Sequence, residues 1–199
     1  MPTLSNAHAL IVGIANYHYV SRLPSTVLND AQAIYNLLID PQHCAYAPEN
    51  VTLLLDDQAT HAALRQAFSA LAIATNPDST VFIYISSHGG RIETGPQAGE
   101  YLLPVDTRFD STEIVAHTAI SGAEFITLLS AIPARKVVVV FDCCYAAGIG
   151  QPKAVEEIEE TRLPTRLSML TTLNLVQPQR AEREFRRLIQ ALQGPLPTR

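Results

Sequence analysis

Apolar residues follow two different spacings along this chain, and the two alternate. Continuous, largely β-branched runs predict strands at residues 8–14 and 51–55, from Thr80 to just before His88, and from Arg135 to just before Cys143. Between them, apolar positions recur every three or four residues and predict helices over residues 27–38, about 60–74 and 122–131. A further amphipathic helix is expected at 179–192.

Polar residues mark where several of these elements begin and end. Thr60 and Ser121 are expected to be N-caps, and Glu124 stands where it would complete a capping box with Ser121. The polar, glycine-containing stretch from Arg91 to Glu100 is expected to be a mobile loop. Residues 101–106 are expected to form a short strand or a hairpin arm.

The regular succession of strand and helix predicts right-handed βαβ units and a parallel sheet, which is an α/β fold. A flavodoxin-like binding domain would share this alternation. It would also need a phosphate-binding loop, and the sequence has none.

Composition narrows the class of protein. A length of 199 residues with 47% hydrophobic and 17% charged residues is typical of one globular domain. The net charge of −5 argues against nucleic acid as a partner. No apolar stretch approaches the roughly 20 residues that cross a bilayer, and the first residues do not form a secretory signal. We therefore expect no membrane association and a cytoplasmic location.

Candidate chemistry lies at two strand ends. The strand from Thr80 delivers His88, and the strand from Arg135 delivers Cys143 and Cys144. Chemistry in parallel sheets collects beyond the carboxyl ends of strands, and a thiol beside an imidazole makes an activated nucleophile. The three cysteines, Cys44, Cys143 and Cys144, are expected to be free thiols, because adjacent cysteines rarely bridge each other and an odd count in a reducing compartment points to free thiols. Neither cysteines nor histidines show metal-ligand spacing, so no metal is expected.

Two motifs carry a resemblance to a known family. Ser86-Ser87-His88-Gly89-Gly90 ends one strand, and Asp142-Cys143-Cys144 ends another, with 56 positions between His88 and Cys144. This pattern resembles the caspase-like cysteine peptidases, particularly metacaspases and orthocaspases. The opening strand and its Tyr17, the Asn29-Asp30-Ala31 helix start and residues 101–106 extend the resemblance over roughly residues 8–150.

The resemblance implies a three-layer α/β sandwich with a mostly parallel central sheet flanked by helices. It places a caspase-like catalytic domain, similar to the large subunit, at residues 1–150. Residues 151–199 would then be a truncated or atypical C-terminal tail. Arg162 and Arg166 in that tail are candidate self-processing sites.

The resemblance also implies roles for individual residues. Cys144 would be the nucleophile and His88 its base, with Cys143 a small apolar side chain. The amides of Gly89 and Cys144 would form the oxyanion hole.

A substrate pocket follows from the same resemblance. Asp30, Ser86 and Asp142 would bind an arginine or lysine side chain, because two carboxylates offer charge-assisted bonds to it. The expected function is a cysteine endopeptidase that cleaves proteins or peptides after Arg or Lys and acts as a monomer. No cofactor is expected. Asp106 and Asp110 alone do not support calcium activation.

A different class of function stays open beside the enzyme. Ser87 stands where the family usually has glycine, and Tyr145-Ala146-Ala147 replaces the common His-Ser-Gly. About 50 residues follow Cys144, whereas a family member continues through two further strands and a helix. A non-catalytic caspase-like module with a regulatory or scaffolding role is therefore the alternative.

Overall fold

The structure is a computed structural model, and it describes residues 3–143. The elements in order are β1 (Ala7–Gly13), α1 (Thr26–Ile39), β2 (Val51–Leu55), α2 (His61–Ala74), β3 (Thr80–Ser86), β4 (Gly89–Ile92), β5 (Gly99–Leu102), α3 (Thr112–Thr118), β6 (Ile120–Ser121), α4 (Gly122–Ser130) and β7 (Lys136–Asp142). Short 3-10 turns, η1 (Pro48–Asn50) and η2 (Asp56–Gln58), flank β2. The predicted α/β fold is confirmed.

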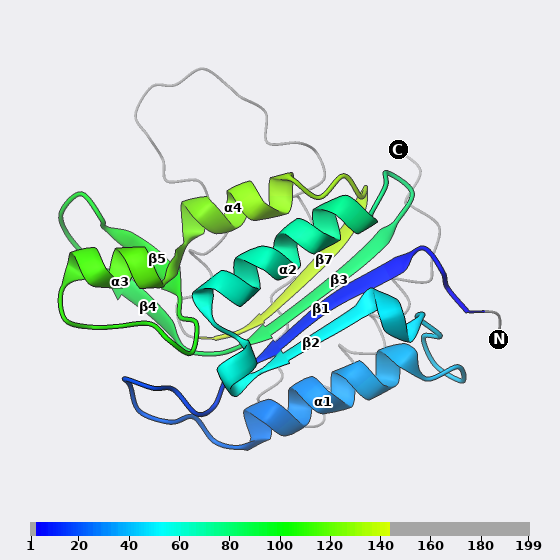
Figure 1. Cartoon of the computed structure of the whole chain (residues 1–199), viewed down its shortest axis with the longest axis horizontal. Helices are drawn as coiled ribbons and strands as arrows, with labels where there is room; N and C mark the ends of the chain where they lie inside the picture. The colour runs from blue at the N-terminus through cyan, green and yellow to red at the C-terminus, as the bar shows by residue number, and fades with distance from the viewer. Residues whose placement is uncertain (1–2, 144–199) are drawn as a thin grey trace.

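The main sheet has the strand order β2-β1-β3-β7, and every neighbouring pair in it is parallel. Helix α1 covers one face, while α2 and α4 cover the other, so the molecule has three layers (Figure 1). Alternate residues of β1 and β3 enter two separate apolar clusters, one under each helical layer. Among the described helices, none is long and apolar enough to span a bilayer.

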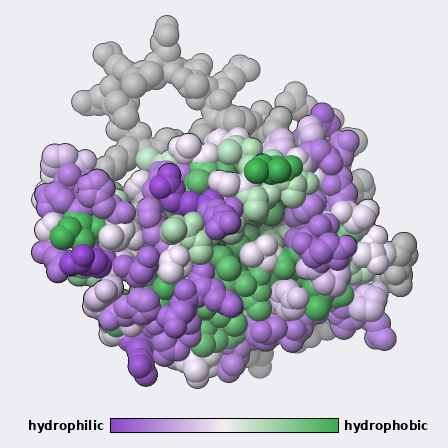
Figure 2. Space-filling view, in the orientation of Figure 1, coloured by the Kyte–Doolittle hydropathy of each residue, from purple (hydrophilic) through white to green (hydrophobic). Residues whose placement is uncertain are grey.

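The surface follows from this layering. In the orientation of Figure 1, hydrophilic residues cover most of the periphery, and hydrophobic residues gather near the middle, over β2 and α1 (Figure 2). Strand β2 is one outer strand of the main sheet, and its last three residues are only partly buried. The central strands β1 and β3, by contrast, are buried along nearly their whole length.

Two predicted helix starts have the expected caps. The Thr60 hydroxyl accepts a hydrogen bond from the Ala63 amide at 3.2 Å, and the Ser121 hydroxyl accepts one from the Glu124 amide at 3.1 Å. The Glu124 carboxylate lies 3.1 Å from Arg65 Nε on α2. Glu124 thus links the two helices that cover the same face of the sheet.

The segment from Arg91 to Glu100 differs from the expected mobile loop. Most of it belongs to a β-hairpin, in which Arg91 pairs with Glu100 and Ile92 with Gly99. The turn is closed by a bond from the Ala98 amide to the Gly95 carbonyl, and Gly95 has a φ of 91°, a conformation that favours glycine. The hairpin joins β6 in a small antiparallel sheet, and α3 lies beside it (Figure 1).

Close packing at the end of β1 brings α1 toward the carboxyl edge of the sheet. A Cβ atom on Gly13 would lie 2.8 Å from the Ala31 Cβ and 3.2 Å from the Val27 carbonyl oxygen. Only a glycine permits this approach of helix to strand. The same contact holds Asp30, the neighbour of Ala31, near the ends of β1 and β3.

Candidate active site

The carboxyl ends of β3 and β7 lie side by side. Ser86 is in register with Asp142, and the Ser86 hydroxyl donates a hydrogen bond of 3.0 Å to Asp142 Oδ2. The Ser87 amide is 3.4 Å from the Asp142 carbonyl oxygen. The structure therefore brings the segments leading to His88 and to the cysteines together at one edge. Cys144 itself lies outside the described residues.

The imidazole of His88 is oriented by a backbone carbonyl. Its Nε2 lies 2.9 Å from the Ser21 carbonyl oxygen. A carbonyl can only accept, so this bond requires the proton on Nε2. In the neutral ring Nδ1 is then the acceptor nitrogen, as a general base requires. Ser21 lies in the loop after β1. A hydrogen bond of 2.9 Å from the Leu23 amide to the Ala15 carbonyl oxygen closes this loop.

The backbone around His88 is arranged by the β4–β5 hairpin. Gly89 pairs with Leu102, and the Leu103 amide donates to the His88 carbonyl at 3.1 Å. In an antiparallel ladder this bond makes Gly89–Leu102 a non-hydrogen-bonded pair. The Gly89 amide is consequently directed away from β5, where it can bind a ligand oxygen.

Tyr17 contacts both the ring and the backbone of His88. The two ring centroids are 4.9 Å apart with the planes at 49°, and the Tyr17 hydroxyl accepts a bond of 2.7 Å from the His88 amide. The same hydroxyl donates to the Leu103 carbonyl at 3.0 Å. Burial raises the pKa of Tyr17 well above its ordinary 10.0, so the hydroxyl keeps its proton.

Asp56 anchors the turn that carries Tyr17. Its Oδ1 accepts bonds from the amides of Ala15 and Asn16 at 2.8 and 2.9 Å, and its Oδ2 accepts one from Asn16 Nδ2 at 2.7 Å. Partial desolvation raises the pKa of Asp56, but these hydrogen bonds outweigh it and leave the pKa below its ordinary value. Asp56 was not among the predicted site residues, because this role depends on a contact across 41 positions of sequence.

An acidic cluster lies beside these strand ends, around Ser86 and Asp142. Desolvation, and after it the charge of Asp142, raise the pKa of Asp30. Burial and then the charge of Asp142 raise the pKa of Tyr84, whose buried hydroxyl lies against Ser86 and Asp142. Two carboxylates and a hydroxyl therefore share one site, which suits a cationic ligand with several donors. Tyr84 was not among the predicted site residues.

We expect Asp30→Asn to raise the melting temperature at pH 7. A carboxyl whose pKa is raised on folding contributes most to stability below its unfolded pKa, near 3.8, and that contribution is lost as pH rises through the folded pKa. Asparagine does not titrate, so the gain should shrink as the pH is lowered toward 3. Thermal melts at several pH values measure this. Asp78→Asn, at the opposite end of β3, is the control, and a pH-independent difference for Asp30→Asn would contradict the expectation.

The two described cysteines, Cys44 and Cys143, lie in apolar surroundings. Cys143 was expected to be a small buried apolar side chain; it packs against the larger apolar cluster but is only partly buried. Cys44 is buried, and burial, followed by the charge of Asp40, raises the pKa of its thiol. A raised pKa leaves less thiolate at neutral pH, which argues against Cys44 as a nucleophile.

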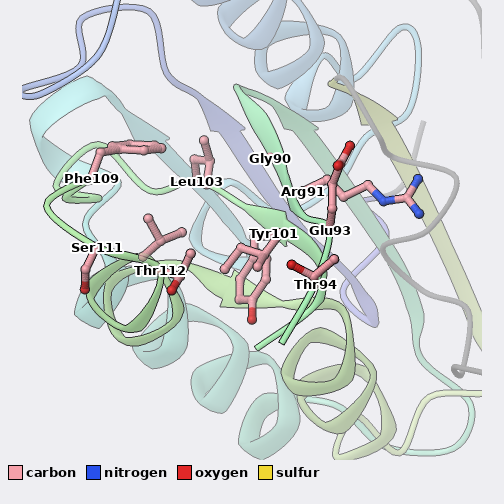
Figure 3. A pocket seen from close by; sticks show the side chains of 11 residues that line it. Gly90, Arg91, Glu93, Thr94, Tyr101, Leu103, Phe109, Ser111 and Thr112 are labelled. Carbon is pink, nitrogen blue, oxygen red and sulfur yellow. The ribbon is translucent and has the colours of Figure 1, made fainter. Parts of the chain in front are cut away.

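A cavity of about 480 Å³ adjoins the segment after His88. Its walls come from the β4–β5 hairpin, α3 and the chain between them; they include Gly90, Leu103 and Phe109. Figure 3 shows Phe109 and Leu103 side by side with Tyr101 below them, while Arg91 extends away from all three. This hollow is distinct from the acidic cluster, and it shares Leu103 with the contacts around His88.

Comparison with known proteins decides the family. The model of a family described as "Caspase domain" matches residues 6–187. The chain belongs to the caspase-domain family. A curated relative, Metacaspase-1 from Eremothecium gossypii, is 30% identical over 152 residues, which are 71% of this chain and 32% of that protein. The chain thus spans about a third of the length of this relative.

A solved structure shares the fold of this chain. Protein GSU0716 from Geobacter sulfurreducens superposes with a TM-score of 0.55 at 20% identity, over 72% of this chain and 51% of that one. At this identity the likeness concerns the fold alone. Within the family the expected site positions are His88 and the segment after β7, and β3 and β7 are neighbouring strands here.

Proposed function

We propose that this member of the caspase-domain family is a cysteine endopeptidase that cleaves after arginine or lysine, with Cys144 as nucleophile and His88 as base. The observation that carries the proposal is the state of His88. Its Nε2 lies 2.9 Å from the Ser21 carbonyl oxygen, and His88 follows directly on β3, which pairs with β7. The bond to Ser21 leaves Nδ1 as the acceptor nitrogen of the neutral ring.

The reaction would proceed in two steps. The His88 imidazole takes the proton of the Cys144 thiol, and the thiolate attacks the scissile carbonyl carbon. The amides of Gly89 and Cys144 stabilise the negative charge that forms on the carbonyl oxygen. The protonated imidazole of His88 then gives its proton to the leaving amine as the C–N bond breaks, which leaves a thioester. Water, deprotonated by the same imidazole, hydrolyses the thioester and restores the thiol.

The acidic cluster supports the choice of substrate. Asp30, Ser86 and Asp142 would bind the cationic side chain before the scissile bond, and Tyr84 would add a hydroxyl at the buried end. A guanidinium has five N–H donors in a fixed plane and can satisfy several oxygen acceptors at once. An aspartate side chain in the same place would face two carboxylates of like charge.

The test is a panel of fluorogenic peptides that are identical except for Arg, Lys, Asp or Ala at the cleavage position. We expect kcat/KM for Arg and Lys to exceed that for Asp by at least about 10²-fold, because a site built for a charged donor rejects a group that leaves its acceptors unpaired. A Cys144→Ala preparation, purified in parallel, controls for contaminating proteases. Cleavage after Asp would contradict the pocket, and no turnover with or without calcium would favour the non-catalytic module.

Other expectations are independent of this panel. A monomeric state, the absence of a cofactor, a cytoplasmic location and self-cleavage at Arg162 or Arg166 remain predictions, and both arginines lie outside the described residues. Of the two carboxylates considered for calcium, Asp106 accepts a bond from the His61 amide at the start of α2, and Asp110 pairs with Arg108.

A further inference from the structure

The bonds between His88 and Leu103 depart from a regular ladder. Gly89 pairs with Leu102, so His88 and Leu103 are the next pair and should exchange two hydrogen bonds. One is present, from the Leu103 amide to the His88 carbonyl at 3.1 Å. In place of the other, the Tyr17 hydroxyl accepts from the His88 amide at 2.7 Å and donates to the Leu103 carbonyl at 3.0 Å.

We propose that Tyr17 is a positioning residue, whose inserted hydroxyl holds the His88 backbone apart from Leu103 and thereby sets the imidazole and the Gly89 amide in their working orientation. The kinetic consequences rest on the proposed peptidase function, whereas the structural ones do not.

Three observations make the hydroxyl a spacer rather than a chance contact. Tyr17 is 7% exposed, so solvent does not compete for its bonds. Both of its hydrogen-bonding roles are used, one as donor and one as acceptor. The turn before it is fixed by three hydrogen bonds to Asp56, so the hydroxyl cannot retreat from the ladder.

The ring of Tyr17 acts on the same histidine from another side. It lies against the imidazole at a centroid distance of 4.9 Å, while Nε2 is bound to Ser21. Tyr17 and Ser21 belong to one loop, so a single segment touches the ring, the backbone amide and Nε2 of His88. A change in the spacing at Leu103 would therefore move the imidazole relative to its carbonyl partner.

The structure allows the two roles of Tyr17 to be separated. In Tyr17→Phe the apolar ring remains, and the His88 amide and Leu103 carbonyl can bond directly to each other. Because both groups stay satisfied, the variant should fold with a melting temperature close to that of the wild type. Closing the gap would shift the imidazole and the Gly89 amide, and a misplacement of about 1 Å typically costs roughly 10²-fold in rate.

The experiment compares Tyr17→Phe with Tyr19→Phe, an exposed tyrosine of the same loop. For Tyr17→Phe we expect kcat on an Arg peptide to fall about 10- to 100-fold with little change in KM, and Tyr19→Phe to match the wild type. A second readout is the imidazole Nε2–H proton of His88 in NMR spectra, assigned by its absence in His88→Ala. This proton should be visible in the wild type and shifted or lost in Tyr17→Phe.

The outcomes separate the two proposals. If the wild type has no peptidase activity, the proposed function fails, and the NMR signal alone tests the role of Tyr17. An unchanged Nε2–H signal, or a kcat within about twofold of Tyr19→Phe, would overturn the positioning role. A Tyr17→Phe variant that does not fold would overturn it too, because the hydroxyl would then be required for stability.

Discussion

Replacing Cys144 with alanine is expected to abolish cleavage of an Arg peptide, whereas Cys143→Ala should retain most of the activity. Removing the nucleophile of a covalent mechanism typically costs about 10⁴-fold or more in kcat. Cys143 is partly buried and packs against the apolar cluster, so its replacement removes a small packed side chain and should affect stability more than turnover. Steady-state kinetics on both purified variants measure the difference.

An active-site label provides an independent check of the nucleophile. A peptidyl chloromethyl ketone ending in arginine should add once to the wild type and to Cys143→Ala, and not to Cys144→Ala, as read by intact-protein mass spectrometry. The reverse pattern would assign the nucleophile to Cys143. Labelling of all three proteins would point to a thiol outside this site, with Cys44 the remaining one.

Asp142→Asn is expected to lower kcat/KM for an Arg peptide by roughly 10- to 10²-fold, because the bound cation would lose the partly buried one of its two carboxylate partners. A citrulline peptide, of nearly the same shape but without charge, should lose far less. The ratio of kcat/KM for the Arg peptide to kcat/KM for the citrulline peptide therefore reports the effect of the charge alone. Asparagine keeps an oxygen that can accept from the Ser86 hydroxyl, which preserves the contact across the strand ends.

Two results would contradict this role for Asp142. An equal loss on both peptides would mean that Asp142 supports the architecture of the edge rather than the charge of the substrate. If Asp142→Asn kept full activity and the same ratio of kcat/KM for the two peptides, the residues that recognise the substrate charge would lie elsewhere. Asp110→Asn, which removes an exposed carboxylate paired with Arg108, serves as the control for a general change in surface charge.

The main sheet was predictable because its strands are long, apolar and uninterrupted. The runs at 8–14 and 51–55 appear as β1 and β2, and helices α1 and α2 lie within one or two residues of the expected bounds. The expected strand or hairpin arm at 101–106 is confirmed only for Tyr101 and Leu102, which lie in β5. Strand β4 and the first half of β5 were not predicted, since their residues are largely polar or glycine and their stability comes from the ladder. Helix α3 was missed for a related reason: it has seven residues and no fully buried side chain.

At the candidate site, the sequence predicted which side chains matter but could not predict the backbone groups that bind them. His88, Ser86 and Asp142 stand at the ends of recognisable strands, and the structure brings these ends together. The carbonyl of Ser21 leaves no trace in the sequence, because every residue has a backbone carbonyl. The hydroxyl of Tyr17 acquires its role only from the spacing of two segments that are distant in sequence.

The contacts of His88 also bear on when the chain could become reactive. Its carbonyl partner lies 67 positions earlier in the sequence, and the tyrosine that touches its ring and amide lies 71 positions earlier. Neither contact exists until the first strand has docked beside the third. A nascent or partly unfolded chain therefore lacks an aligned imidazole, which ties any proteolytic competence to completed folding.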